Sequence, residues 1–312
     1  MSDGATGGGA NLNADTTAST RHGVILLLAA VMPPMAIISL VPVLPLLLEE
    51  FASVKGSEFL VPIAMTVPAL CVALFSPVAG WLSDRVGRKN LLILALVIYA
   101  AIGVVPFFLS DLEQIIAARV GLGVAEAIIM TIATALIGDY FSGKERLRWV
   151  GRQIATVSLS AIVLIALGGI LGQAIGSRGP FLLYLLALPV ALAAAVILFE
   201  PARSTDHAEK NNESLPLARI IPILMTTLFV GIVFYTMIVK LGEILGLTAS
   251  VSPAQIGAIG AGANIAVAVG SIVFSRMRGA SGSTLLLTGL TLAAIGYLGT
   301  GLSGSLVVTS IA

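Results

Sequence analysis

Charged residues are scarce in this chain. Asp, Glu, Lys and Arg together make up 11% of its 312 residues, whereas a soluble domain has about 25%. Hydrophobic residues make up 57%, and the mean hydropathy is +1.04. A soluble fold of this length could not bury so much apolar surface. The composition therefore excludes a soluble protein and predicts one that lies in a lipid bilayer.

Cysteine and histidine are also scarce. Cys71 is the single cysteine, so no disulfide can form within the chain, and its place in an apolar run indicates a packing role. His22 and His207 lie in polar segments without partners at ligand spacing, so we expect no metal site and no cofactor. The net charge of +1 gives no reason to expect nucleic acid, whose binding proteins carry a basic face.

Apolar segments dominate what remains. A helix that crosses the hydrocarbon core needs about 20 mostly apolar residues. Nine segments meet this requirement: 23–48, 59–82, 90–109, 113–138, 152–175, 180–199, 219–247, 253–275 and 283–303. A tenth run starts near Leu306 and reaches Ala312 before it is long enough to span. The sequence thus predicts an all-α, polytopic membrane protein with nine complete helices and the start of a tenth.

The cations are distributed unevenly between the two sides of this arrangement. One side, with the N-terminal tail, holds most of them: Arg21, Arg85, Arg88, Lys89, Lys144, Arg146, Arg148, Arg152, Arg203, Lys210, Arg219, Arg276 and Arg278. The opposite side holds Lys55 and Arg178 beside several acids. Because Lys and Arg favour the cytoplasmic side, we expect a multi-pass protein of the plasma (inner) membrane with a cytoplasmic N-terminus. Residues 1–20 are polar and lack the basic segment of a signal peptide, which predicts a disordered tail.

The connection between the second and third segments reads GWLSDRVGRKN over residues 80–90. Gly87 suits a tight turn with positive φ, and Gly80 would permit close helix approach. Asp84 stands near the C-terminal end of a helix, where the macrodipole disfavours an acid. The positive-inside rule accounts for the cations of this turn but for neither the acid nor the glycines.

These residues resemble the G-x-x-x-D-R-x-G-R-[RK] signature of the major facilitator superfamily: Gly80, Asp84, Arg85, Gly87, Arg88 and Lys89 all match. In that family the turn links helices of the N-terminal half, and its Asp contacts the start of the eleventh helix and favours the outward-open state. The resemblance implies that Asp84 and Arg85 act as a conformational latch.

A second stretch, ARVGLGVAEAIIMTIATALIGDYFSGKERLRWVG, resembles the fourth helix of the family and the loop after it. The matching positions are Arg119, Gly123, Glu126, Asp139 and Arg146, and the variant with Glu is similar to spinster-like and organic-anion branches. Asp139 and Arg146 would belong to a cytoplasmic charge network. The fifth segment has Gly168, Gly169 and Gly172 but lacks the proline typical of drug–proton antiporters, which weakens an antiporter assignment.

The resemblance also divides the chain. It implies a six-helix bundle over 21–199, a cytoplasmic linker over 200–218 and an incomplete second bundle over 219–312. The segment SIVFSRMRG echoes the first turn, with Ser275 in the place of Asp84 and Arg276 in the place of Arg85. Because members of the family have twelve helices, we expect that the chain is a fragment of a longer protein rather than a degenerate copy.

Charged side chains at membrane depth are costly and indicate function. Glu126 lies near the midpoint of the fourth span, where a carboxyl group suits proton uptake and release; a structural hydrogen bond to a neighbouring helix is the alternative. Arg119 lies about 10 Å from it along the same face, and a water or a substrate anion could bridge the two, or Arg119 could snorkel to the headgroups. Lys240, Glu243 and Asn264 are weaker candidates for a central cavity, and Pro33, Pro34, Pro42 and Pro45 predict a broken or kinked first helix.

We therefore expect a secondary active transporter, a monomer in the lipid bilayer, that moves a small-molecule substrate by alternating access and couples to the proton gradient. A membrane receptor that transports nothing, or an inactive copy of a transporter, is the alternative. The sequence has no nucleophile–base pair and no metal-ligand cluster, so we do not expect an enzyme.

Overall fold

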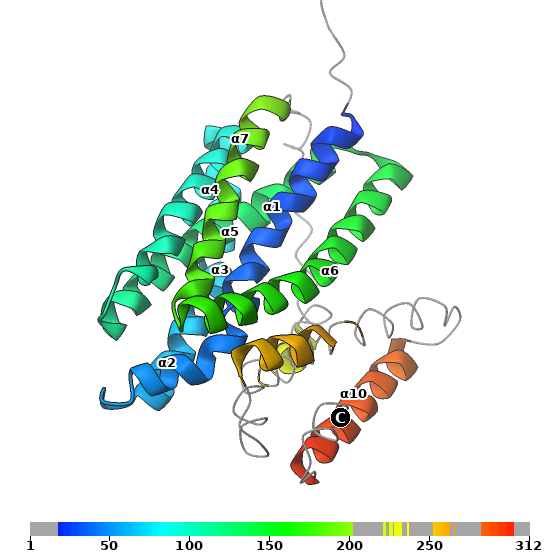
Figure 1. Ribbon diagram of the computed structural model, residues 1–312. Helices are drawn as coiled ribbons and strands as arrows, with labels where there is room; N and C mark the ends of the chain where they lie inside the picture. The colour runs from blue at the N-terminus through cyan, green and yellow to red at the C-terminus, as the bar shows by residue number, and fades with distance from the viewer. Residues whose placement is uncertain are drawn as a thin grey trace, which may run out of the picture.

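The computed structural model describes residues 18–201, 221–222, 225–226, 228–232, 236, 252–262, 265 and 282–302. Regular structure in these ranges is helical throughout. The elements in chain order are α1 (Thr20–Ile38), η1 (Val41–Val43), α2 (Leu44–Glu50), α3 (Ser57–Val86), α4 (Arg88–Val104), η2 (Val105–Phe107), α5 (Leu112–Tyr140), α6 (Gly143–Ile175), η3 (Gly179–Leu186), α7 (Ala187–Ile197) and α10 (Gly282–Leu302) (Figure 1).

Six helices are long and apolar enough to cross a membrane, and they correspond to the first six predicted spans. The prediction of a helical membrane bundle is confirmed for this part of the chain. The ninth predicted span, 283–303, coincides with α10, whereas 219–247 and 253–275 lie largely outside the described residues. Most of the predicted tail (1–20) and linker (200–218) also lies outside them, so the count of nine helices and a tenth stays a prediction.

The first span is broken, as its prolines predict. Pro33 and Pro34 lie inside α1, which ends at Ile38. The chain then passes through the 3₁₀ turn η1, in which the N–H of Val43 bonds to the carbonyl of Leu40 at 3.0 Å, before α2 resumes. Because Pro42 has no N–H, an unbroken α-helix would leave a carbonyl without a donor at this depth. The break therefore has a local cause.

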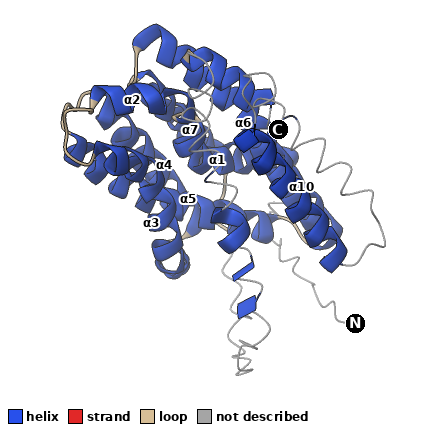
Figure 2. Ribbon diagram, turned by 90° about the horizontal axis from the view of Figure 1, so that it is seen from below, coloured by secondary structure: helices blue, strands red, loops and turns tan. Residues whose placement is uncertain are grey.

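The bundle is built around α5, which packs against α3, α4 and α1 (Figures 1 and 2). One face of α5 is fully buried and includes Leu122, Ile129 and Ala133. Large apolar side chains cover much of the outer surface, among them Leu192 and Val196 of α7. In water such a surface would be unfavourable, so its exposure is the pattern expected of helices that face lipid.

The glycines of α6 lie where three segments meet. A Cβ on Gly168 would stand 2.0 Å from the carbonyl oxygen of Ser39, at the break of the first span. A Cβ on Gly169 would stand 2.6 Å from the carbonyl oxygen of Pro253, which lies in residues 219–312, the second part of the chain. Only glycine lets the backbones approach this closely. α6 thus touches residues 253–257 in the half of the helix that ends at Ile175.

Candidate functional site

The turn of residues 84–89 joins α3 to α4. Gly87 has φ 104° and ψ 147°, so the prediction that this position needs positive φ is confirmed. Among the described residues no helix comes very close to Gly80, because a Cβ there would meet Thr131 Cγ2 at 3.9 Å, so the close approach expected at Gly80 stays a prediction for the rest of the chain. That distance is an ordinary van der Waals contact, and α3 and α5 would accommodate a methyl group at Gly80.

Arg88 is the centre of a charged cluster at this end of the bundle. Its guanidinium donates to Asp84 at 3.0 Å and to both carboxylate oxygens of Asp139 at 2.5 and 2.6 Å. The Arg88 side chain therefore ties the end of α3 to the end of α5. Arg146 forms no ion pair among the described residues, and its guanidinium instead lies against Gly138, 3.2 Å from the place of a Cβ there. The network that was predicted around Asp139 thus runs through Arg88.

Glu200 completes this cluster and was missed in the sequence. Its carboxylate accepts the backbone N–H groups of Arg88 at 2.6 Å and of Lys89 at 2.8 Å. These are among the first N–H groups of α4, which have no partner within the helix, and the positive end of the helix dipole favours an anion there. A Cβ on Gly87 would lie 3.1 Å from Glu200 Oε1, so the glycine also makes room for the carboxylate.

Asp84 and Arg85 have their described partners in the same half of the chain. The side chain of Asp84 is 66% exposed, and Arg88 is its ion-pair partner. The guanidinium of Arg85 lies 4.0 Å over the ring of Trp81, one helical turn earlier. The exposed carboxylate of Asp84 lies at the end of α3.

Arg119 lies in the interior of the bundle, with 1% of its surface exposed, so the alternative in which it snorkels to the headgroups is wrong. Its Nε donates to the carbonyl of Ala64 at 2.9 Å, and its other nitrogens donate to the carbonyl of Ala36 at 2.8 Å and to the hydroxyl of Tyr184 at 2.5 Å. A weaker bond reaches the carbonyl of Met65 at 3.3 Å. The side chain joins α1, α3, α5 and η3.

The acceptors of Arg119 explain why it is buried. Pro68 has no N–H, so the carbonyl of Ala64, four residues earlier, lacks its helical donor. The carbonyl of Ala36 also lacks its helical donor, because α1 ends at Ile38 and the N–H of Leu40 bonds to the carbonyl of Ile37 instead. Arg119 donates to both. The observed geometry is that of a side chain that satisfies backbone groups.

Glu126 lies two turns further along the same buried face of α5 and is 2% exposed. Its Oε1 is buried and has no hydrogen-bond partner among the described residues, which does not match the alternative of a structural hydrogen bond. α3 runs close by, since a Cβ on Gly123 would lie 2.6 Å from Cys71 Cβ and 2.7 Å from Pro68 Cα. A buried carboxylate without a donor is costly, whereas a protonated carboxyl group needs fewer partners.

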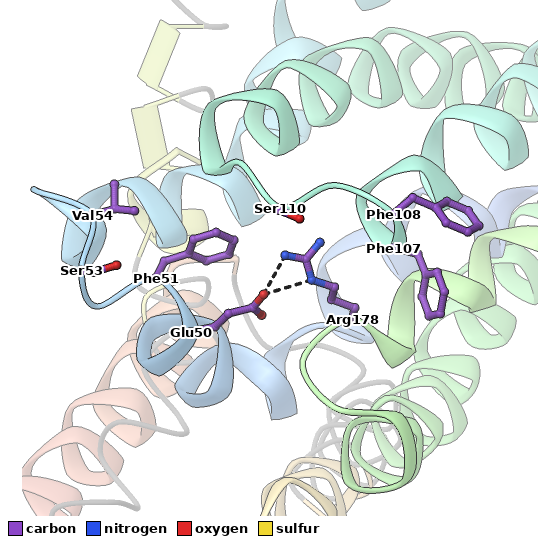
Figure 3. Close-up of a pocket in the computed structure, with 8 residues that line it drawn as sticks. All are labelled: Glu50, Phe51, Ser53, Val54, Phe107, Phe108, Ser110 and Arg178. Carbon is purple, nitrogen blue, oxygen red and sulfur yellow. Dashed lines mark hydrogen bonds and ion pairs between the residues drawn. The ribbon is translucent and has the colours of Figure 1, made fainter.

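A cavity of about 390 Å³ opens at the other end of the bundle, and no sequence pattern pointed to it (Figure 3). The guanidinium of Arg178 donates to Glu50 Oε1 at 2.6 and 3.1 Å and to the carbonyl of Pro106 at 3.0 Å. Ser177 donates to the other oxygen of the same carboxylate. This ion pair joins α2, η2 and the start of η3, and Phe51, Phe107 and Phe108 surround it.

Three weaker candidates, Lys240, Glu243 and Asn264, lie outside the described residues, as do Ser275 and Arg276. The described ranges contain no group of three or more His, Cys, Asp or Glu side chains that could hold a metal ion.

The chain has relatives among known proteins. The chain is similar to the tetracycline resistance protein, class H, of Pasteurella multocida (27% identity over 60% of this chain and 46% of the relative). It is also similar to the class B protein of Escherichia coli (27%, 66% and 53%) and to the arabinose-proton symporter of Escherichia coli K12 (30%, 54% and 34%). The chain spans about half the length of the tetracycline resistance proteins that it matches.

The fold has known counterparts. The chain superposes on the crystal structure of a bacterial homolog of the human lysosomal transporter Spinster, in an inward-facing and occupied conformation, with a TM-score of 0.71. The identity is 18%, and the match covers 93% of this chain and 70% of the other. A profile of the Major Facilitator Superfamily matches residues 26–312. The chain therefore belongs to the Major Facilitator Superfamily.

Proposed function

We propose that this chain forms the first half and part of the second half of a secondary active transporter, which moves a small solute across the membrane by alternating access. Residues 21–199 form the first bundle in this proposal, 200–218 the linker and 219–312 part of the second bundle. Support comes from the family, whose matched relatives bear the names of transporters. The two ends of the bundle also differ, since one carries the charged turn of 84–89 and the other the ion pair of Glu50 and Arg178. The observation that carries the proposal is the exposed Asp84 on a rigidly held turn.

The turn of 84–89 is suited to act as a latch. Arg88, Asp139 and Glu200 fix its shape from inside the first bundle, whereas the Asp84 carboxylate remains exposed. A group that must form and break a contact with a second bundle needs this combination of a fixed backbone and an accessible charge. Arg85 and Lys89 would contribute to the same contact. We place this end at the cytoplasmic side, in accordance with the excess of cations there.

The contacts of α6 indicate which end is closed. Gly169 and Gly257 lie backbone to backbone, and a Cβ on either residue would stand 3.3 Å from the Cα of the other. This contact between the two parts of the chain lies toward Ile175, away from the turn of 84–89. In the proposal, this contact closes the side of the protein opposite the turn of 84–89, and the Asp84 latch is released while that side is closed.

Glu126 is the residue that we propose for proton coupling. It lies near the midpoint of a membrane span, its Oε1 lacks a donor among the described residues, and Arg119 is the cation whose charge acts on it. The carboxyl group can therefore exchange a proton when a rearrangement of α3 and α5 opens a path to it. The arabinose-proton symporter, by its name, couples a solute to protons, which supports the same energy source here.

Solute-driven proton movement in proteoliposomes tests this function. The complete gene product is reconstituted with an internal pH-sensitive dye, and a panel of sugars, organic acids and cationic drugs is added outside. We expect at least one solute to drive proton flux in the wild type, and Glu126→Gln to abolish the flux. Glu113→Gln, an exposed Glu in the first turn of the same helix, is the matched control and should retain it. Coupled flux that persists in Glu126→Gln would refute the role of Glu126, and the absence of any transport would refute the function.

A further inference from the structure

The first turns of α6 carry a dense group of cations. Lys144, Arg146, Arg148 and Arg152 lie within ten residues, Glu145 is the one acid among them, and all five side chains are exposed. α6 has 33 residues and is therefore about 50 Å long, whereas the hydrocarbon core of a bilayer is about 30 Å thick. The surplus length places these turns at the level of the lipid headgroups of one leaflet.

Trp149 determines which way these turns face. It is 2% exposed, stacks on Phe141 at 4.9 Å, and lies so close to α1 that a Cβ on Gly23 would stand 2.3 Å from the indole. Trp149 is fixed against the bundle, and positions 144, 148 and 152 recur every fourth residue, so they form one stripe along the helix. All three of these side chains are exposed. The guanidinium of Arg152 lies 4.5 Å over the Trp149 ring, which holds it within this stripe.

Among the described residues, the charge of the stripe has one weak partner. Arg148 and Glu145 are 3.8 Å apart, and their side chains are 69% and 52% exposed, so water screens this pair. Next to the cations, Leu147 and Ile154 expose 72% and 65% of their surface. A basic stripe beside exposed aliphatic side chains is the arrangement by which helices bind at the boundary between headgroups and acyl chains.

We propose that Lys144, Arg148 and Arg152 bind the phosphate groups of anionic phospholipids in the leaflet that surrounds this end of α6. The stripe supplies three cations at intervals of one helical turn, about 6 Å, and Leu147 and Ile154 contact the first carbons of the acyl chains. Charge complementarity favours a lipid with a net negative headgroup over a zwitterionic one. This site is independent of the transported solute and of which leaflet faces the cytoplasm.

Lipid titration of the full chain in a neutral detergent tests the proposal. Binding of dihexanoyl-phosphatidylglycerol, dihexanoyl-phosphatidylcholine and glycerol phosphate is measured by thermophoresis at low and high salt. We expect the wild type to bind phosphatidylglycerol more tightly than the other two probes, and the preference to fall in high salt. Lys144→Gln should weaken this binding about fivefold, and Lys144→Gln with Arg148→Gln about 25-fold, since each cation near a membrane surface contributes about 1 kcal/mol.

Lys55→Gln is the matched control, because Lys55 is also exposed but lies at the other end of the bundle. Its affinity for phosphatidylglycerol should equal that of the wild type. Equal affinity of the wild type for phosphatidylglycerol and phosphatidylcholine would overturn the proposal. So would an equal loss in Lys55→Gln, or binding of glycerol phosphate as tight as that of the lipid, which would indicate a site for free phosphate.

Discussion

The burial of Arg119 leads to a sharp prediction, because its contacts compensate for a particular proline. Replacing Arg119 by Met leaves the carbonyls of Ala64 and Met65 without their donor from this side chain, whereas Ala36 keeps a donor in the hydroxyl of Tyr184 at 3.0 Å. A buried polar group left without a partner costs about 1–3 kcal/mol. We therefore expect Arg119→Met to lower the stability of the bundle by about 2–4 kcal/mol, of which the Ala64 carbonyl accounts for about 1–3 kcal/mol.

A substitution of Pro68 separates the loss of stability that comes from the Ala64 carbonyl from the rest. Pro68→Ala restores the N–H that an α-helix directs at the Ala64 carbonyl, so Arg119→Met should be less harmful in that background. The double-mutant cycle should show a coupling of about 1–3 kcal/mol between the two positions. Thermal unfolding of the four variants in one detergent measures it, with Arg148→Met as an exposed control that leaves stability unchanged. Additive effects of Arg119→Met and Pro68→Ala would show that Arg119 does not replace the missing donor.

Two further predictions concern the turn between α3 and α4. Gly87→Ala should destabilise the protein by about 1–3 kcal/mol, because φ is 104° and the new Cβ would also lie 3.1 Å from Glu200 Oε1. Gly56→Ala is the control and should destabilise the protein less, because Gly56 has φ 80° but a Cβ there would have no atom within 4 Å. Equal melting temperatures of the two variants would contradict this account. Glu200→Gln should weaken the charge-assisted hydrogen bonds from the Arg88 and Lys89 amides and raise the hydrogen-exchange rate of these amides at least several-fold. The exchange rates of the amides at the start of α5 should not change. Unchanged exchange at residues 88 and 89 would exclude the capping role of Glu200.

The helices that cross the membrane could be predicted because their signal is local. Hydropathy over about 20 residues fixes where a span lies, and the prolines of the first span fix where it breaks. The boundary of α6 shows the limit of this reasoning. Hydropathy placed its start at residue 152, whereas the helix begins at Gly143. The first turns of α6 are rich in Lys and Arg, so their hydropathy is not that of a membrane span. These residues nevertheless favour a helix outside the hydrocarbon core.

The partners of the polar side chains could not be predicted, because they depend on contacts between distant segments. Glu200 reaches Arg88 across 112 positions, and nothing near Glu200 in the sequence marks it as a helix cap. The signal for Arg119 was available in part. A proline inside a membrane helix leaves a carbonyl without a donor, and Arg119 is one of the few donors at that depth. Which proline it would serve follows only from the packing of α3 against α5.

The most direct test of the account is the effect of Asp84 on transport. Asp84→Asn removes the exposed charge of the turn, and Asp111→Asn makes the same change at the N-terminus of α5, on the opposite side of the bundle. Solute uptake into proteoliposomes and insertion into the membrane are measured for both variants. We predict that Asp84→Asn reduces uptake at least tenfold with normal insertion, while Asp111→Asn transports like the wild type. Uptake by Asp84→Asn at the rate of the wild type would contradict a latch at this end of the protein.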